Sequence, residues 1–150
     1  MYPPSVLARV RSAAVIGLQA HPVDVEVDVG RGLPSFAIVG LPDPAVQEAK
    51  ERVRAAVRNA GYELPPRRIT VNLAPADVRK AGPAFDLPMA VGVLAATAQV
   101  RPAGLAETML LGELSLDGRL RPVTGALPVA LAARTLGIRT LVVPEMNGPE

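Results

Sequence analysis

The residues in this sequence that are able to do chemistry are few, and most of them are arginines. The chain contains no cysteine and a single histidine, His21, which excludes a thiol nucleophile, a disulfide framework and a cysteine-based zinc site. Lys50 and Lys80 are the only lysines. The tightest groups of positive charge are therefore two pairs, Arg67-Arg68 and Arg79-Lys80, in a chain whose net charge is only +2.

These two basic pairs flank the segment 69–77 and permit two interpretations. The simpler one is a solvated loop surface. The alternative is a phosphate-contacting patch on one rim of the domain, formed by Arg67, Arg68, Arg79 and Lys80. Four neutralised phosphates would give a log–log salt slope of only about −3.6 on duplex DNA. Any DNA contact by this patch is therefore expected to be weak and nonspecific.

The sequence shows no established motif for binding a nucleotide or a metal ion. It contains no Gly-x-x-x-x-Gly-Lys-Ser/Thr, and Gly30-x-Gly32 is followed by Leu33-Pro34 rather than by a helix. The acidic residues Asp24, Glu26 and Asp28 could in principle bind a hard cation, but they alternate with valines as on the wet face of a strand. We therefore expect no metal and no cofactor in this chain.

A small set of secondary-structure elements must position these residues. Alternating valines predict a strand over 21–29, and a turn at 20–22 would pair it with 5–18 as a hairpin. Asp43 is expected to cap a helix that continues to Ala60, and Asp86 to cap a buried helix over 87–98. The remaining predictions are strands at 35–39, 68–73, 109–116, 119–123 and 139–143, with a turn at Asp117-Gly118, and a helix at 127–136.

This order of elements predicts an α+β domain with a mixed sheet and helices mainly on one face. The length suits one domain over residues 1–150, and the 49% apolar content, with only 3% aromatic, suits a core of Val, Leu, Ile and Ala. Residues 1–4 lack the basic start of a signal peptide, and the apolar run 87–98 is too short to span a bilayer. We therefore expect no membrane contact and a cytoplasmic location.

Five stretches in unbroken order resemble the N-terminal domain of the ComM/YifB family of Mg-chelatase-like AAA+ ATPases. No single stretch is as specific as their combination, which extends from about Ser5 to Val143. The stretches are 32–43 (GLPSFAIVGLPD), 53–57 with 59–62 (VRAAV and NAGY), 69–77 (ITVNLAPAD), 85–90 (FDLPMA) and 112–119 (GELSLDGR).

The resemblance implies the fold shared by ribosomal protein S5 domain 2 and the Lon protease domain. It also implies a following AAA+ module that binds ATP and Mg²⁺, a hexameric full-length protein, and ATP-driven branch migration of DNA during natural transformation. On this interpretation the chain is a non-catalytic domain, expected to be excised from a longer protein, that serves ring assembly or guidance of the DNA substrate.

The Lon likeness raises a second class of function, a Ser-Lys peptidase. Such an enzyme needs a serine just before the buried helix and a lysine early in the later helix. The matching positions are Ala84, in Ala81-Gly82-Pro83-Ala84, and Leu127, and neither side chain can act as nucleophile or base. The peptidase interpretation is therefore disfavoured, and Ala84 and Leu127 are predicted to lie close together at a vacated dyad site. A third interpretation, an RNA- or ribosome-associated S5-like module, is weakened by the low aromatic content.

Overall fold

The computed structural model describes residues 5–149, and the segment 1–4 used in the targeting argument lies outside them. Its centre is a mixed six-stranded sheet in the order β3-β4-β2-β1-β5-β8. The strands are β1 (Ser5–Ile16), β2 (Gln19–Gly30), β3 (Ser35–Val39), β4 (Arg68–Ala74), β5 (Thr108–Leu110) and β8 (Thr140–Val142). The pairs β1–β2 and β2–β4 are antiparallel, whereas β3–β4, β1–β5 and β5–β8 are parallel.

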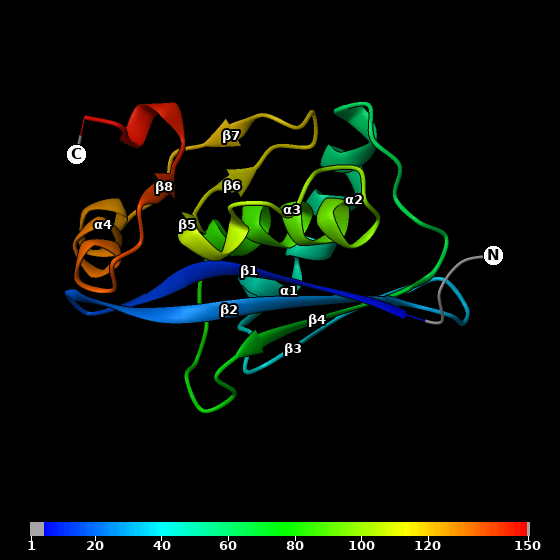
Figure 1. The fold of residues 1–150 in the computed structure, drawn as a ribbon, viewed down its shortest axis with the longest axis horizontal. Helices are drawn as coiled ribbons and strands as arrows, with labels where there is room; N and C mark the ends of the chain where they lie inside the picture. Colours follow the sequence, from blue (N-terminus) through cyan, green and yellow to red (C-terminus); the bar gives the residue numbers. More distant parts are fainter. Residues whose placement is uncertain (1–4, 150) are drawn as a thin grey trace.

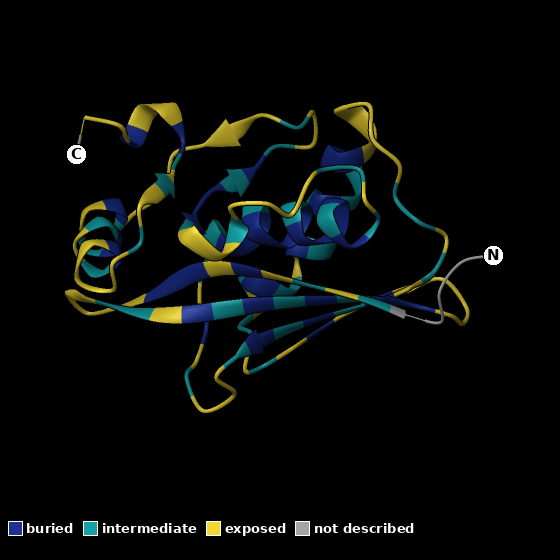
Figure 2. Cartoon of the chain, viewed as in Figure 1, coloured by how far each residue is buried: buried dark blue, intermediate teal, exposed yellow. Residues whose placement is uncertain are grey.

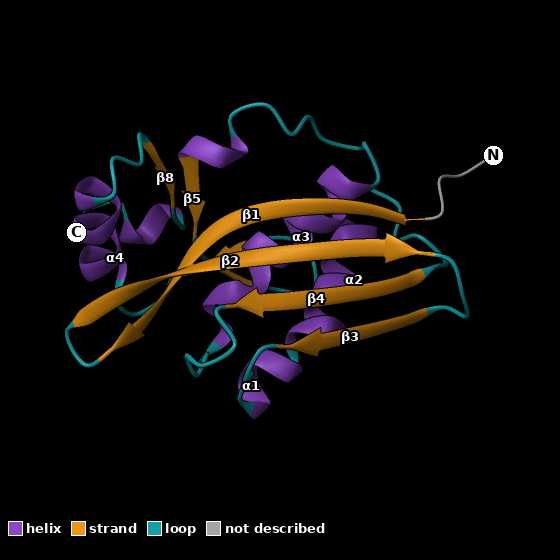
Figure 3. Ribbon diagram, turned by 60° about the horizontal axis from the view of Figure 1, so that its bottom comes forward, coloured by secondary structure: helices purple, strands orange, loops and turns teal. Residues whose placement is uncertain are grey.

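The helices cover one face of this sheet, as Figures 1 and 3 show. They are α1 (Pro44–Gln47), α2 (Ala49–Asn59) and α3 (Asp86–Ala96), with α4 (Ala126–Thr135) at the end where the β1–β2 hairpin turns. A separate small hairpin joins β6 (Glu113–Leu114) to β7 (Leu120–Arg121). Three single-turn helices complete the structure: η1 (Pro83–Phe85), η2 (Leu105–Glu107) and η3 (Glu145–Asn147). The predicted α+β architecture is confirmed.

The alternating valines of β2 build the centre of the core, as predicted. Val25 and Val27 are fully buried, while the intervening acidic residues lie half-buried on the other face. Buried residues concentrate between the sheet and α2–α3 (Figure 2). Helix α3 packs closely because Gly92 faces Val27: an added Cβ would lie 2.4 Å from a Val27 methyl. Within residues 5–149, no helix combines the length and apolarity needed to cross a membrane.

The first hairpin turns earlier than the sequence suggested. The turn lies at Gly17-Leu18, with Ile16 opposite Gln19, and Pro22 is part of β2, opposite Ala13. Pro22 is tolerated within a strand because β4 pairs only with residues 24–30 of β2, which leaves an edge at this end. The turn prediction at 20–22 was therefore wrong.

The helix predicted after Asp43 is interrupted at Glu48 and becomes α1 and α2. Asp43 caps it as expected, since its carboxylate accepts from the Val46 N–H at 2.8 Å. The interruption is stabilised by Arg52, whose guanidinium donates to the Ala45 carbonyl at 3.0 Å and so replaces a helical N–H donor.

The strand predicted over 109–116 divides into β5 and β6 at Gly112. There the chain leaves the main sheet to pair with the start of α3: the Gly112 N–H donates to the Ala84 carbonyl at 2.9 Å, and the Leu87 N–H donates to the Gly112 carbonyl at 3.0 Å. The turn at Asp117-Gly118 is confirmed between β6 and β7, where Gly118 has a φ of 92°.

Candidate functional site

The two positions of the predicted vacated dyad both lie at helix starts. Ala84 is in η1 directly before α3, and Leu127 is the second residue of α4. Ala84 packs against an apolar cluster that includes Ala126, the neighbour of Leu127 in the chain, whereas Leu127 itself is 48% exposed. A methyl and an isobutyl group offer no nucleophile and no base at these positions. The closeness of the two side chains to each other stays a prediction.

Two of the serines in the domain have structural hydrogen bonds. Ser12 is fully buried and donates to the Leu110 carbonyl at 2.7 Å, which ties β1 to β5. The Ser115 hydroxyl accepts from the Arg121 guanidinium at 3.0 Å across the β6–β7 hairpin. Both hydroxyl groups therefore have a structural role, in which they link neighbouring segments of the fold.

The two basic pairs do not share one rim. Arg67 and Arg68 lie at the start of β4, and Arg79 and Lys80 lie beyond its end, after the loop that follows Ala74. Seven strand residues extend over about 20 Å, and Figure 3 shows the two ends of β4 at opposite sides of the sheet. The expected four-residue patch is therefore not formed as a single surface.

Lys80 is also not a surface residue. Its side chain is fully buried, and its ammonium donates to the Pro75 carbonyl. Its backbone is fixed as well, because the Lys80 N–H donates to Leu41 at 3.0 Å and the Asp43 N–H donates to the Lys80 carbonyl at 2.9 Å. Desolvation lowers the pKa of the Lys80 ammonium, against the opposing effect of the Asp77 carboxylate. Lys80 thus stabilises the loop after β4 and cannot contact a phosphate in this conformation.

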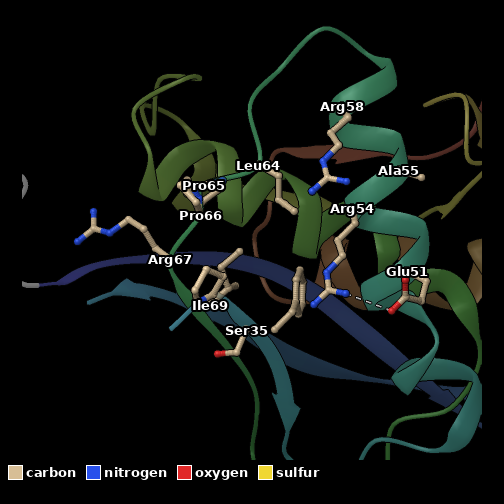
Figure 4. A pocket seen from close by; sticks show the side chains of 12 residues that line it. Ser35, Glu51, Arg54, Ala55, Arg58, Leu64, Pro65, Pro66, Arg67 and Ile69 are labelled. Carbon is tan, nitrogen blue, oxygen red and sulfur yellow. Dashed lines mark hydrogen bonds and ion pairs between the residues drawn. The ribbon is translucent and has the colours of Figure 1, made fainter. Parts of the chain in front are cut away.

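The structure instead places three arginines around a cleft of about 450 Å³ between α2 and the first residues of β3 and β4. Arg54 and Arg58 come from α2, and Arg67 comes from the segment that leads into β4 (Figure 4). Sequence reasoning missed Arg54 and Arg58 as site residues. Their spacing of four positions was the available signal, because it places two side chains on one helix face.

Buried residues support the charged side of this cleft. The guanidinium carbon of Arg54 lies 5.8 Å from the centre of the Phe36 ring, a cation–π arrangement. Arg54 also donates to the Glu51 carboxylate at 3.3 Å. Ile69 and Phe36, both nearly fully buried, form apolar lining, while Arg58 is exposed to solvent. The arrangement presents guanidinium groups over a rigid apolar base, which suits an anionic ligand.

A buried ion pair fixes α2, and with it the arginines, relative to the rest of the domain. The Arg52 guanidinium donates to both carboxylate oxygens of Asp86, at 2.6 and 3.0 Å, and the Leu114 N–H donates to the same carboxylate at 3.0 Å. Burial raises the pKa of Asp86, although these hydrogen bonds lower it. Asp86 was predicted to cap α3, which is wrong: it is the first residue of the helix, and its side chain connects α2, α3 and β6.

Among the acidic side chains of β2, Glu26 is bonded to both neighbouring strands. Glu26 accepts from Arg9 of β1 at 2.9 Å and from Asn72 of β4 at 2.8 Å. Asn72 therefore bonds to the residue opposite it in the sheet. No group of three or more potential metal ligands of the His, Cys, Asp or Glu type occurs in the part of the chain that the structure describes.

Comparison with known proteins identifies the family. The profile described as "Subunit ChlI of Mg-chelatase" matches residues 25–147. YifB of Salmonella typhimurium and competence protein ComM of Haemophilus influenzae are each 46% identical over 96% of the chain. Lon protease of Mycolicibacterium smegmatis is 27% identical over 91% of the chain. The chain spans 28% of the length of YifB and of ComM, and 18% of that of Lon. It therefore belongs to the Mg-chelatase-like family of the ChlI subunit, together with YifB and ComM.

Proposed function

We propose that this chain is a non-catalytic domain of a longer Mg-chelatase-like ATPase, in which it serves ring assembly or guidance of a DNA substrate. The observation that carries the proposal is the 46% identity to competence protein ComM across almost the whole chain. In this proposal ATP, Mg²⁺ and the motor activity belong to the part of the longer protein outside this chain, and six copies assemble as a ring. Branch migration of DNA during natural transformation is the process that such a motor would drive.

The side chains at the dyad positions support the non-catalytic part of the proposal. The Lon similarity favours a peptidase as the second candidate function. That function needs a hydroxyl and an amine where the chain has Ala84 and Leu127. We therefore expect no turnover of fluorogenic casein above buffer, and no effect of Ser35→Ala or Ser115→Ala. Turnover that either substitution abolished would restore the peptidase interpretation.

Deletion of this domain from the longer protein tests the accessory role. We expect the shortened motor to retain basal ATP hydrolysis, because the nucleotide site lies elsewhere, and to lose branch migration of a synthetic four-way junction. Light scattering then separates the two roles: loss of the hexamer supports assembly, and an intact hexamer with slow migration supports guidance. An intact hexamer with unchanged migration would contradict both roles.

Binding of nucleotide to the chain itself provides a complementary test. Because the sequence has no phosphate-binding loop, isothermal titration of the 150-residue chain with Mg-ATP should show no micromolar binding. Micromolar affinity would place part of the nucleotide site in this domain and would contradict the proposed division of labour.

A further inference from the structure

We infer that the cleft between α2 and the starts of β3 and β4 is a binding site for the phosphodiester backbone of a nucleic acid. We call it the arginine cleft and define it by Arg54, Arg58 and Arg67, with Phe36 and Ser35. The inference deepens the proposed function and rests on it for the choice of nucleic acid over an acidic polypeptide. It relocates the contact from the predicted four-residue patch to a surface that the fold assembles.

The charges in the cleft favour an anion. Three arginines contribute to its lining against one carboxylate, that of Glu51; the guanidinium groups of Arg54 and Arg58 extend over it, while that of Arg67 extends outward (Figure 4). Glu51 is 67% exposed and pairs with Arg54 at 3.3 Å, so solvent screens its charge effectively. Within residues 5–149, no hydrogen bond or ion pair engages the exposed Arg58 guanidinium. Arg58 therefore has all its donors available to an incoming oxyanion.

The spacing of Arg54 and Arg58 suits a phosphate group. Residues four positions apart on a helix project from the same face with Cβ atoms about 5–6 Å apart, and Figure 4 shows both guanidinium groups extending from α2 over the cleft. A guanidinium offers two parallel N–H donors that match two oxygens of a phosphate. The opposite wall is formed by Phe36 and Ile69, whose side chains are nearly fully buried. One phosphate can thus be contacted by both arginines of α2.

A neighbouring cleft of about 790 Å³ is less suited to an anion. It lies on the other side of the segment 65–67, and its lining combines Arg31, Arg67 and Glu63 with Ala95–Gln99 at the C-terminal end of α3. The last carbonyl groups of a helix carry partial negative charge, which disfavours an anion there. Of the two clefts that share Arg67, the arginine cleft is therefore the one that favours phosphate.

The same geometry indicates contact with the backbone rather than with bases. Phe36 is only 6% exposed and its ring is covered by Arg54, so it is not available as a stacking platform. Base readout is therefore not expected, and binding should depend on charge and salt but not on sequence.

Fluorescence anisotropy of the 150-residue chain with a labelled 20-base-pair duplex and a labelled 20-nucleotide strand tests the site. The test variant is Arg54→Gln/Arg58→Gln, and the matched control is Arg134→Gln/Arg139→Gln, which removes the same charge from exposed positions at the α4–β8 end. At low salt we expect the test variant to bind at least about fivefold more weakly and to lose about 1.8 from the duplex salt slope. The control should bind like the wild type.

Three outcomes would overturn the inference. They are no binding of either DNA by the wild-type chain at low salt, equal weakening in test and control variants, and competition by poly-glutamate as effective as by DNA at matched charge. The last outcome would assign the cleft to an acidic polypeptide.

A single substitution guards against an effect of misfolding. Arg54 covers Phe36, so the double variant can lose stability, whereas Arg58 is exposed and Arg58→Gln should leave the thermal midpoint unchanged. That variant should still lose about 0.9 from the duplex salt slope, and an unchanged slope would contradict the site. A failure of the proposed function gives a different result. If the 150-residue chain binds DNA at the cleft but Arg58→Gln in the longer protein leaves branch migration normal, the binding site stands and the guidance role alone is contradicted.

Discussion

At the residue scale, the role that the sequence suggests for Lys80 differs from the role that the structure shows. A lysine beside an arginine in a polar segment suggests a surface contact, yet Lys80 is fully buried and donates to the Pro75 carbonyl. Its carbonyl also accepts from the Asp43 N–H, so it connects the loop after β4 to the start of α1. The role that follows is loop positioning, and the adjacent Arg79 is the exposed member of the pair.

Charge reversal separates these roles. We expect Lys80→Glu to lower the free energy of unfolding by roughly 3–5 kcal/mol, because a buried carboxylate would face the Pro75 carbonyl without a donor. Arg79→Glu, one residue away and exposed, should leave the urea midpoint nearly unchanged. Equal, small effects in the two variants would show that Lys80 is accessible to solvent.

Glu26 provides a pH-dependent test at the same scale. The hydrogen bonds from Arg9 and Asn72 lower its pKa against the opposing effect of burial. Because the folded pKa lies below the unfolded value, the stability from this group is present above the unfolded pKa and is lost as pH falls through the folded pKa. Arg9→Gln should therefore raise the Glu26 pKa toward its ordinary value in an NMR titration. Arg11→Gln, opposite Asp24 in the same hairpin, is the control and should shift it less.

At the element scale, the position of α2 is decided by one buried carboxylate. Asp86 begins α3, but its oxygens are bonded to Arg52 of α2 and to the backbone of β6. Breaking this connection leaves a partly buried guanidinium and a buried N–H without their acceptor, which costs far more than a surface pair contributes. The orientation of the arginine cleft depends on the same connection, since α2 forms one of its walls.

Two partners of Arg52 allow a matched comparison. Asp86→Ala should lower the free energy of unfolding by about 3–5 kcal/mol. Glu48→Ala removes the exposed partner of the same arginine, 3.5 Å away, and should cost less than about 1 kcal/mol. Urea denaturation of both variants measures the difference, and comparable costs would mean that the Asp86 pair does not fix the helix.

At the scale of the whole molecule, a domain with net charge +2 is a poor autonomous ligand for DNA. The groups proposed to contact phosphate lie in one cleft, and screening at physiological salt reduces their contribution. In the proposed hexamer, however, six clefts would be held together, and tethering raises the effective concentration of each further contact. The proposed DNA contact is therefore a property of the assembly more than of the single chain.

This difference predicts the salt dependence. The 150-residue chain should bind a DNA junction only at low salt, and the hexameric longer protein should bind it more tightly, with a steeper log–log salt slope because more phosphates are contacted. Anisotropy titrations measure both slopes. The salt concentration is varied from about 50 to about 200 mM, because phosphate contacts lose most of their affinity over this range. Equal slopes for chain and hexamer would show that the domains do not bind DNA together.

The sequence by itself determined the features that depend on local patterns. Alternating valines predicted β2, Asp43 predicted the cap of α1, and Asp117-Gly118 predicted the β6–β7 turn, because each signal lies within a few neighbouring residues. The ordered motifs also predicted the family, which the comparisons confirm.

Only the tertiary structure decided which charged residues are buried, paired or exposed. Burial of Lys80, the pairing of Asp86 with Arg52, and the placement of Arg58 and Arg67 in the lining of one cleft all depend on contacts between segments that packing brings together. Desolvation and hydrogen bonding then fix the role of each charge, and both depend on three-dimensional neighbours that local sequence does not specify. For this reason the residues of the predicted basic patch lie at two separate places, whereas the arginine cleft could be recognised only in the folded domain.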